Sequence, residues 1–383
     1  MSTLSKQIIE NACMSNGEFV VPENIQRAIE HCIATDDQSL IIQEYHRLLK
    51  EYRRYRKLMI PAKIDYHGDL TIDAYTTFYL PRNIVIPWIA MRDLSLHNRF
   101  RVLPKKLNIL DLGSGTGAIV LGLLHLFNSR AFSTIKTNVV SVDYFPETLK
   151  RQRELIKSAG FSLVGIHFME ADLNNFDDYV APISEHGPYD FVFTGNCFTE
   201  LEEEAAKNII AQTPGFLTDN GVVIIAEAQR DYIKSMIGIL ARLSNSVGLS
   251  VFYPCPQYSC DSNGWCWVWR THDYDFPLMQ IAGKPLEEYA REDLVLSWLI
   301  LTKKKISLYR DFRQNNPHLF FGPIAQEKSL DKEKRRYVED YGICTGEGVR
   351  TFKKDYQISL DYSRGSIVGL AEEDKLEIYQ DLN

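Results

Sequence analysis

A glycine-rich turn with one acid stands in NILDLGSGTGAIVLGLL, residues 108–124. Asp111 lies near the end of the first apolar run, and Gly113, Gly115 and Gly117 follow it at every second position. Glycines after a strand let the backbone turn without steric cost and come close to a ligand. The pattern also satisfies the loose GxGxxG/A dinucleotide motif, so alone it leaves S-adenosylmethionine (SAM) and NAD both open.

Two later acids favour SAM. Asp143 ends the run NVVSVD and can accept hydrogen bonds from both ribose hydroxyls, while Asp172 in MEADL is placed to accept from the adenine amino group. Asp111 can hold the ammonium group of the cofactor through water or backbone. Three acids suit a cationic sulfonium better than a pyrophosphate, which needs helix N–H groups. NAD, or an α/β domain without a nucleotide, remains the alternative.

This combination resembles the class I SAM-dependent methyltransferases over about residues 107–302, with the loop in YDFVFTGNCFTEL (189–201) facing the transferred methyl group. The loop lacks the Asn/Asp-Pro-Pro-aromatic motif that grips an exocyclic base amine, so methylation of such an amine is not indicated. We expect Asn196 to touch the methionine moiety. The predicted cofactor-binding residues are Asp111, Gly113, Gly115, Gly117, Asp143, Asp172, Leu173 and Asn196.

The catalytic residues are not identifiable from the sequence. Cys197 has two interpretations, the nucleophile of a cytosine five-position methyltransferase or a small core residue, and no Pro precedes it. No general base stands out. A sulfonium donor needs mainly in-line positioning, so a base can be absent when the acceptor is already nucleophilic.

Three of the seven cysteines crowd into PCPQYSCDSNGWCWVWR, residues 254–270. Cys255, Cys260 and Cys266 are spaced C-x4-C-x5-C, unlike the tight C-x2-C pair of a zinc ribbon. The spacing is closer to loose ligation of an iron–sulfur cluster with a fourth thiolate from elsewhere. Cys344, flanked by glycines in YGICTGEG, is the best fourth candidate. Zinc on the trio with Cys344 or His272, and inert buried thiols, remain open.

A second resemblance rests on a Pro-Cys-Pro segment, a second Cys, a Trp-Cys dipeptide and a nearby Arg after a methyltransferase core. These features resemble the methyltransferase-like family that associates with the small ribosomal subunit, whose mitochondrial members are assembly factors. The matching residues are Pro254-Cys255-Pro256, Cys260, Trp265-Cys266, Arg270, FTEL at 198–201, WLILTKKK at 298–305 and Cys344-Thr345-Gly346. The resemblance implies a four-iron, four-sulfur cluster on Cys255, Cys260, Cys266 and Cys344.

Hydrophobic periodicity predicts the elements that position these residues. Residues 1–60 have helical spacing, as in LIIQEYHRLLKEYRRYRKL. From residue 107, short apolar runs alternate with helix-like segments, which predicts an α/β fold with a Rossmann-like, mostly parallel seven-strand sheet. We expect strands at 107–112, 138–143, 163–168, 189–194, 221–228 and 294–305. We expect helices at 116–128, 146–159, 200–213 and 228–245.

The chain is expected to divide into three parts. Residues 1–90 form an N-terminal helical domain, and residues 91–305 form the SAM-binding core with a cysteine-rich insertion at 254–271. Residues 306–383 lose the alternation and are predicted to be a small strand-rich appendage.

Charge is distributed unevenly. The net charge of −7 argues against a simple nucleic-acid binder, but residues 42–106 hold 13 Lys and Arg against 6 Asp and Glu. Residues 303–354 hold 13 Lys and Arg against 7 Asp and Glu. EYHRLLKEYRRYRK (44–57) mixes six basic residues with three tyrosines, and HNRFRVLPKK (97–106) precedes the glycine strand. Such stretches can bind phosphates and stack bases, or form a solvated helix face.

The composition also indicates a compartment. An apolar run of about 18 residues is absent, and the N-terminus lacks an apolar core, so the sequence predicts neither a membrane span nor a signal peptide. We expect a cytoplasmic monomer, where cysteine clusters favour metal over disulfides.

The leading hypothesis is a SAM-dependent methyltransferase that acts on RNA, ribosomal or ribosome-associated, with a structural iron–sulfur cluster. A non-catalytic SAM-binding assembly factor is one alternative, and a small-molecule or protein methyltransferase is another. RNA binding separates the last from the first two, and methyl transfer separates the first from the second.

Overall fold

The computed structural model describes ten stretches of the chain. These are residues 2–15, 18–228, 231–253, 267–271, 293–308, 319–329, 338–345, 348–353, 367–371 and 376–377.

The central sheet follows the order β10-β12-β9-β8-β5-β6-β7, and β11 pairs with β12 at the edge. Pairs among β5 to β9 are parallel, whereas β12 is antiparallel to β9, β10 and β11. This confirms the predicted mostly parallel sheet, with seven strands in one continuous order and β11 as an eighth strand. The strands are β5 (Lys106–Leu112), β6 (Lys136–Asp143), β7 (Ile166–Glu170), β8 (Tyr189–Gly195), β9 (Leu217–Ala228), β10 (Ser250–Tyr253), β11 (Trp267–Thr271) and β12 (Asp293–Thr302).

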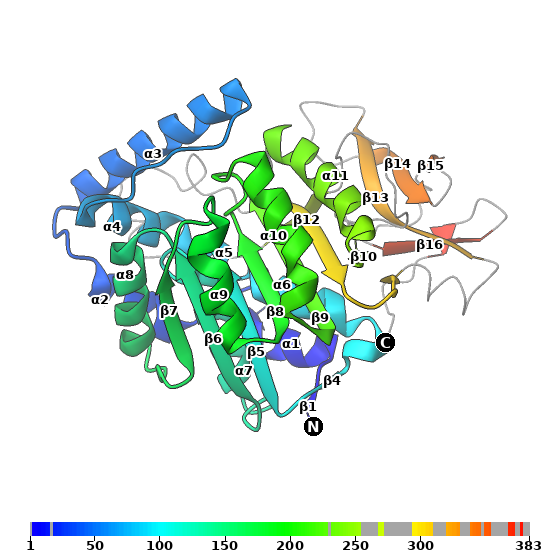
Figure 1. Cartoon of the computed structure of the whole chain (residues 1–383). Coiled ribbons are helices and arrows are strands. Elements are labelled where there is room, and N and C mark those ends of the chain that lie inside the picture. The colour runs from blue at the N-terminus through cyan, green and yellow to red at the C-terminus, as the bar shows by residue number, and fades with distance from the viewer. Residues whose placement is uncertain are drawn as a thin grey trace.

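Helices cover both faces of this sheet (Figure 1). Successive residues of a strand point to opposite faces, so Ile109 of β5 belongs to one buried cluster and Leu110 to the other. The helices of the core are α7 (Ala118–Asn128), α8 (Pro146–Ser158), α9 (Phe176–His186), α10 (Glu203–Phe216) and α11 (Asp231–Ser246). The sequence did not predict α9, which contains Pro182, or the short strand β10.

The N-terminal part is helical, as predicted. Its helices are α1 (Lys6–Cys13), α2 (Glu23–Cys32), α3 (Gln38–Leu58), α4 (Asp69–Phe78), α5 (Leu80–Asn83) and α6 (Ile86–Ser95). Short elements accompany them: β1 (Ser2–Thr3), β2 (Met14–Ser15), β3 (Glu18–Phe19), the 3-10 helix η1 (Asn98–Phe100) and β4 (Val102–Leu103). The predicted boundary between residues 90 and 91 lies within α6 and stays a prediction.

Buried contacts tie the N-terminal helices to the core. Trp88 of α6 is fully buried, and its indole Nε1 donates to the backbone oxygen of Gly122 in α7 at 2.7 Å. The buried Asp73 of α4 pairs with Arg151 of α8, and its carboxylate also accepts from the backbone of Thr35 at 2.8 Å. Burial of an ion pair is costly unless such additional hydrogen bonds satisfy the charges. These helices are therefore held in one position over the sheet.

The C-terminal part forms its own antiparallel sheet, in the order β15-β14-β13-β16-β17. The strands are β13 (Leu319–Ser329), β14 (Val338–Thr345), β15 (Gly348–Lys353), β16 (Ile367–Ala371) and β17 (Leu376–Glu377). This confirms the strand-rich appendage. Within the described ranges, we find no helix whose length and apolar character would let it cross a bilayer.

Candidate functional site

A cavity of about 610 Å³ opens at the carboxyl ends of β5, β6 and β8. The parallel strand β5 lies between β6 and β8, so the connections leave it toward opposite sides and a crevice forms there. Gly113, Asp143 and Asn196, which follow or end these three strands, line the cavity. A segment of the N-terminal part lines it from the other side, with Ala62, Lys63, Ile64 and Tyr66.

The glycine turn has the backbone conformation that the sequence pattern predicts. Gly113, Gly115 and Gly117 have φ of +70°, +52° and +92°, in the left-handed region that other residues rarely adopt. A Cβ atom on Gly113 would lie 2.5 Å from the Sγ atom of Cys197. A Cβ atom on Gly117 would lie 2.4 Å from the Cγ atom of Gln152. Both conformation and packing therefore require glycine at these two positions.

Asp111 is fully buried beneath the turn, and it is not among the residues that line the cavity. Within the described part of the chain, neither of its carboxylate oxygens has a hydrogen-bond partner. Burial, and then the charge of Asp143, raise the pKa of Asp111 well above its usual range. A buried carboxylate without a partner is costly, and a cationic group or a bridging water would satisfy it. Since Asp111 does not line the cavity, an ammonium group there would interact with it through water or backbone.

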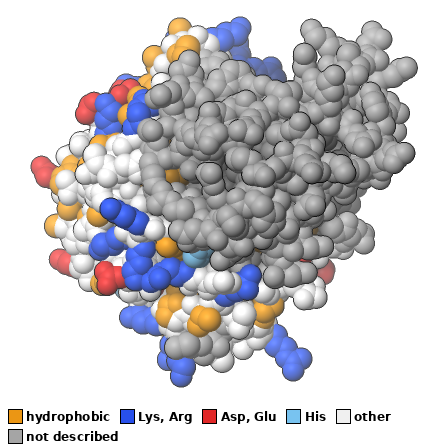
Figure 2. All heavy atoms as spheres, turned by 90° about the vertical axis from the view of Figure 1, so that its right-hand side faces the viewer, with side chains coloured by type: hydrophobic (Ala, Val, Ile, Leu, Met, Phe, Trp, Pro, Cys, Tyr) orange, Lys and Arg blue, Asp and Glu red, His pale blue; other side chains and the backbone are white. Residues whose placement is uncertain are grey.

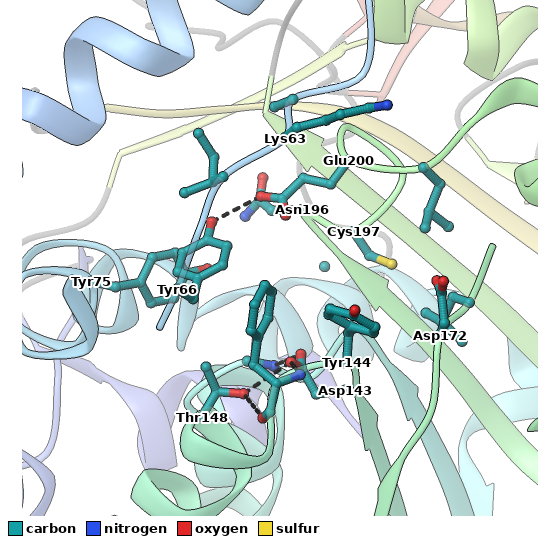
Figure 3. A pocket seen from close by; sticks show the side chains of 18 of the residues that line it. Lys63, Tyr66, Tyr75, Asp143, Tyr144, Thr148, Asp172, Asn196, Cys197 and Glu200 are labelled. Carbon is teal, nitrogen blue, oxygen red and sulfur yellow. Dashed lines mark hydrogen bonds between the residues drawn. The ribbon is translucent and has the colours of Figure 1, made fainter. Parts of the chain in front are cut away.

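Asp143 lines the cavity and is held by three donors (Figure 3). Its carboxylate accepts from the backbone of Gly115 at 2.7 Å and of Phe145 at 3.0 Å, and from the Thr148 hydroxyl at 2.9 Å. Burial raises its pKa, while these hydrogen bonds lower it. The donors fix the position of a carboxylate at the end of β6.

Asp172 and Leu173 line the same cavity after the neighbouring strand β7. Asp172 is half-buried and accepts from the backbone of Asn174 at 2.9 Å. The predicted ribose and adenine acids thus follow adjacent strands and face one cavity.

The loop after β8 is attached to the end of β9 by a buried acid. The carboxylate of Glu227 accepts from the backbone N–H groups of Cys197 and Phe198, both at 3.0 Å, and of Thr199 at 3.1 Å. Asn196 has a φ of +58°, and its Oδ1 atom accepts from the backbone of Ala228 at 2.7 Å. Four hydrogen bonds therefore hold this loop in one conformation against β9.

Cys197 is buried and lines the cavity. Burial, and then the charges of Glu227 and Glu200, raise the pKa of its thiol well above the usual value. A nucleophilic cysteine needs a thiolate, which positive surroundings stabilise. The acidic surroundings of Cys197 oppose this, and the structure favours the interpretation as a small buried residue.

Tyrosines and one further acid form a part of the site that sequence reasoning missed. The Tyr66 hydroxyl donates to the Oε1 atom of Glu200 at 2.9 Å, and the hydroxyls of Tyr52 and Tyr66 are hydrogen-bonded to each other. Tyr75 of α4 packs edge-on against Tyr66, with ring centroids 5.4 Å apart. Figure 3 shows Tyr66, Tyr75 and Glu200 around the part of the cavity opposite Asp172. The sequence offered tyrosine-rich stretches, but nothing in it paired them with Glu200.

Most of the predicted cofactor residues meet in this cavity. Gly113, Gly115, Asp143, Asp172, Leu173 and Asn196 line it. Asp111 is buried below the turn. Gly117 stands directly before α7 and packs against the side chain of Gln152.

The predicted cluster ligands Cys255, Cys260 and Cys266 lie outside the described residues. The backbone of Cys344 in β14 pairs with Val349 in β15. Elsewhere in the described stretches, His, Cys, Asp and Glu side chains form no group of three or more that could hold a metal ion.

Comparison with known proteins gives one family match. Residues 103–275 match the family model described as a methyltransferase domain. No curated protein matches the chain.

Several solved structures are similar to the chain at low sequence identity. A methyltransferase from Pyrococcus furiosus is 12% identical, with a TM-score of 0.35, over 67% of this chain and 96% of its own. A TehB-like SAM-dependent methyltransferase from Corynebacterium glutamicum is 17% identical, with a TM-score of 0.33. The match covers 55% of this chain and 87% of the Corynebacterium protein. TrmN from Thermus thermophilus is 14% identical, with a TM-score of 0.33. The match covers 60% of this chain and 53% of TrmN.

Proposed function

From the match of residues 103–275 to a methyltransferase domain, we propose that the chain is a SAM-dependent methyltransferase that transfers methyl groups to RNA, ribosomal or ribosome-associated, and holds a structural iron–sulfur cluster. The observation that carries the RNA proposal is a basic, solvent-facing helix, α3, whose Tyr52 contacts the cavity-lining residues Tyr66 and Glu200.

The cavity residues fit SAM by the chemistry of their donors and acceptors. SAM supplies an electrophilic methyl group on a cationic sulfonium. We infer that Asp143 binds the ribose hydroxyls, that Asp172 binds the adenine amino group, and that the buried Asp111 holds the ammonium group through water or backbone. The glycine turn allows the backbone to approach the cofactor closely.

The α3 helix brings positive charge to the rim of the cavity. Arg53, Arg54 and Lys57 are exposed on its C-terminal half, and Figure 1 shows this half extending along the outside of the molecule. Lys63 follows at the cavity rim, 3.7 Å from Glu202. Figure 2 views the molecule from the right-hand side of Figure 1 and shows Lys and Arg side chains, with several acids among them, on the described surface. Lys and Arg bind phosphates without sequence preference, which suits the backbone of an RNA.

The second basic stretch, residues 97–106, lies far from the cavity. Lys105 and Lys106 stand at the start of β5, and the cavity lies beyond Leu112 at its end. Six residues of a strand span about 20 Å. Support for RNA binding near the cavity therefore comes from α3 rather than from residues 97–106.

For the cluster, we propose Cys255, Cys260, Cys266 and Cys344 as ligands, with zinc as the alternative metal. Tyr253 pairs with Ile300, and Trp267 pairs with Ser297, on the same edge of β12. These two points are about 10 Å apart along the strand. The chain between them, which carries the three cysteines, therefore leaves and rejoins the sheet at neighbouring positions, which supports a compact ligand set.

The experiment that tests the RNA proposal is crosslinking of the full chain to RNA, sequencing of the bound RNA, and transfer of labelled methyl groups to it. Labelled RNA supports the proposal. Bound RNA without label favours a non-catalytic assembly factor. The absence of bound RNA, together with methyl transfer to a small molecule or protein, contradicts it.

A further inference from the structure

The loop after β8 presents the carboxylate of Glu200 to the cavity. Glu200 is half-buried, lines the cavity, and lies four residues after Asn196. Its Oε1 atom accepts from the Tyr66 hydroxyl at 2.9 Å and from the Tyr52 hydroxyl at 3.4 Å. Burial and the charge of Glu200 raise the pKa of both tyrosines, so both phenols stay protonated. Tyr66 donates its proton to Glu200, and the proton of Tyr52 is shared between the Tyr66 oxygen and Glu200. The carboxylate is thus held in position by neutral donors, of which Tyr66 is the closer.

Asn196 is another side chain of this loop with an acceptor oxygen at the cavity, and its Oδ1 atom accepts from the backbone of Ala228 at 2.7 Å. That hydrogen bond uses one of the two lone pairs of the oxygen and holds Asn196 against β9. Glu200 therefore presents a charged acceptor of this loop to the cavity. The expectation that amine methylation is not indicated came from a missing motif, whereas the structure supplies an acidic side chain from the same loop.

The surroundings of Glu200 select against an anionic acceptor. The side chains of Asp143, Asp172 and Glu202 also line the cavity, and Lys63 is the cation among its described lining residues. Aromatic rings flank the carboxylate: Tyr66 contacts Tyr75 and Phe145 edge-on, with centroids 5.4 Å apart in both pairs. Flat rings beside an acid suit a planar group that carries N–H donors, such as a base of RNA.

A carboxylate suits a nitrogen acceptor better than an oxygen acceptor. A nitrogen acceptor attacks with its own lone pair and becomes a strong acid only as it gains the methyl group, so a carboxylate can take its proton. A hydroxyl acceptor must lose its proton early, to a much stronger base than a carboxylate. The chemistry of the Glu200 side chain therefore favours nitrogen.

We infer that Glu200 is the proton acceptor of the methyl-acceptor subsite, that Tyr66 and Tyr52 position it, and that the subsite takes a planar N–H-bearing acceptor. This inference rests on the proposed function. In the step, the nitrogen lone pair forms the new N–C bond while the C–S bond of the methylsulfonium donor breaks. The C–S electron pair stays on sulfur, and the N–H proton passes to the carboxylate of Glu200.

The test compares the affinities of two ligands in the full chain by calorimetry. One is S-adenosylhomocysteine, the demethylated product. The other is sinefungin, which carries an amine where SAM carries its sulfonium methyl group. In the wild-type protein, sinefungin should bind more tightly because its amine meets Glu200. In Glu200→Gln this preference should fall by about tenfold or more, the loss expected for one charge-assisted hydrogen bond, with product affinity unchanged within about twofold.

Two variants sharpen the result. Tyr66→Phe keeps the carboxylate but removes a positioning donor, so it should weaken the sinefungin preference less than Glu200→Gln does. Glu204→Gln removes an equal charge from an exposed position of α10, outside the cavity, and should leave the preference unchanged. An unchanged preference in Glu200→Gln, or an equal fall in Glu204→Gln, overturns the inference. Failure of the wild-type chain to bind either ligand overturns the proposed function itself.

Discussion

Gly113 lies directly against Cys197, so that a Cβ atom at position 113 would stand 2.5 Å from the Sγ atom of the cysteine. This contact joins the glycine turn after β5 to the loop after β8, the two loops that form the floor of the cavity. At Gly115 the situation differs, because the nearest atom to an added Cβ is Cε1 of Tyr75 at 3.8 Å. The two glycines share a left-handed backbone and differ in the space around them.

A pair of alanine variants uses this difference. Gly115→Ala should cost about 1–2 kcal/mol of unfolding free energy, from the left-handed backbone alone. Gly113→Ala should cost about 1–3 kcal/mol more, because the new methyl group overlaps Cys197. Urea unfolding of both variants measures the difference, and equal losses would show that the contact with Cys197 is not tight.

Removal of the Glu227 carboxylate should release the loop after β8. In Glu227→Gln, the amide group cannot accept from all three backbone N–H groups, which leaves at least one of them unsatisfied in the interior. We expect a loss of about 1–3 kcal/mol in unfolding free energy. The exposed Glu204→Gln should stay within about 0.5 kcal/mol of the wild type. The same stability for both variants would contradict the role of Glu227.

RNA binding should depend on α3 and not on the far end of β5. We expect Arg53→Glu with Arg54→Glu to weaken RNA binding by at least about tenfold and to lower its salt dependence, because each lost phosphate contact removes about 0.9 from the slope. Lys105→Glu with Lys106→Glu makes the same change in charge and serves as the control. Filter binding over a range of salt concentrations measures both pairs. Equal losses would indicate non-specific attraction to the whole chain.

The iron–sulfur proposal predicts brown protein after anaerobic purification, with about four irons per chain. Cys344→Ser should lower the iron content, while Cys32→Ser on α2 should not, because Cys32 lies in the N-terminal part. Elemental analysis of the two variants gives the answer. Full iron occupancy in Cys344→Ser would show that the fourth ligand is wrong. Colourless protein with about one zinc per chain would replace the cluster with a zinc site.

The sequence predicted those parts of the site that depend on short-range order. Asp111 and the glycines after it lie on one strand and one turn, and Asp143 ends the next strand, so apolar runs and turn residues located them. The sheet followed from the same alternation. The helix α9 was missed because Pro182 interrupts its pattern, and such residues usually mark helix ends.

Contacts between distant segments could not be predicted in this way. Tyr66 and Glu200 are 134 residues apart, and their hydrogen bond depends on how the N-terminal helices pack over the sheet. The sequence pattern placed Glu227 near the end of an apolar strand. The backbone N–H groups that donate to its carboxylate lie about thirty positions earlier in the chain. A single sequence carries no signal for either pairing, because both arise from tertiary packing.

Calorimetric titration of the full chain with SAM tests the assignment of the cofactor site. We expect one binding site in the micromolar range, no binding of NAD, and a loss of about 1.5–3 kcal/mol in binding free energy for Asp143→Ala, which removes a charged acceptor from the ribose. Unchanged SAM affinity in Asp143→Ala, or binding of NAD in place of SAM, would contradict it.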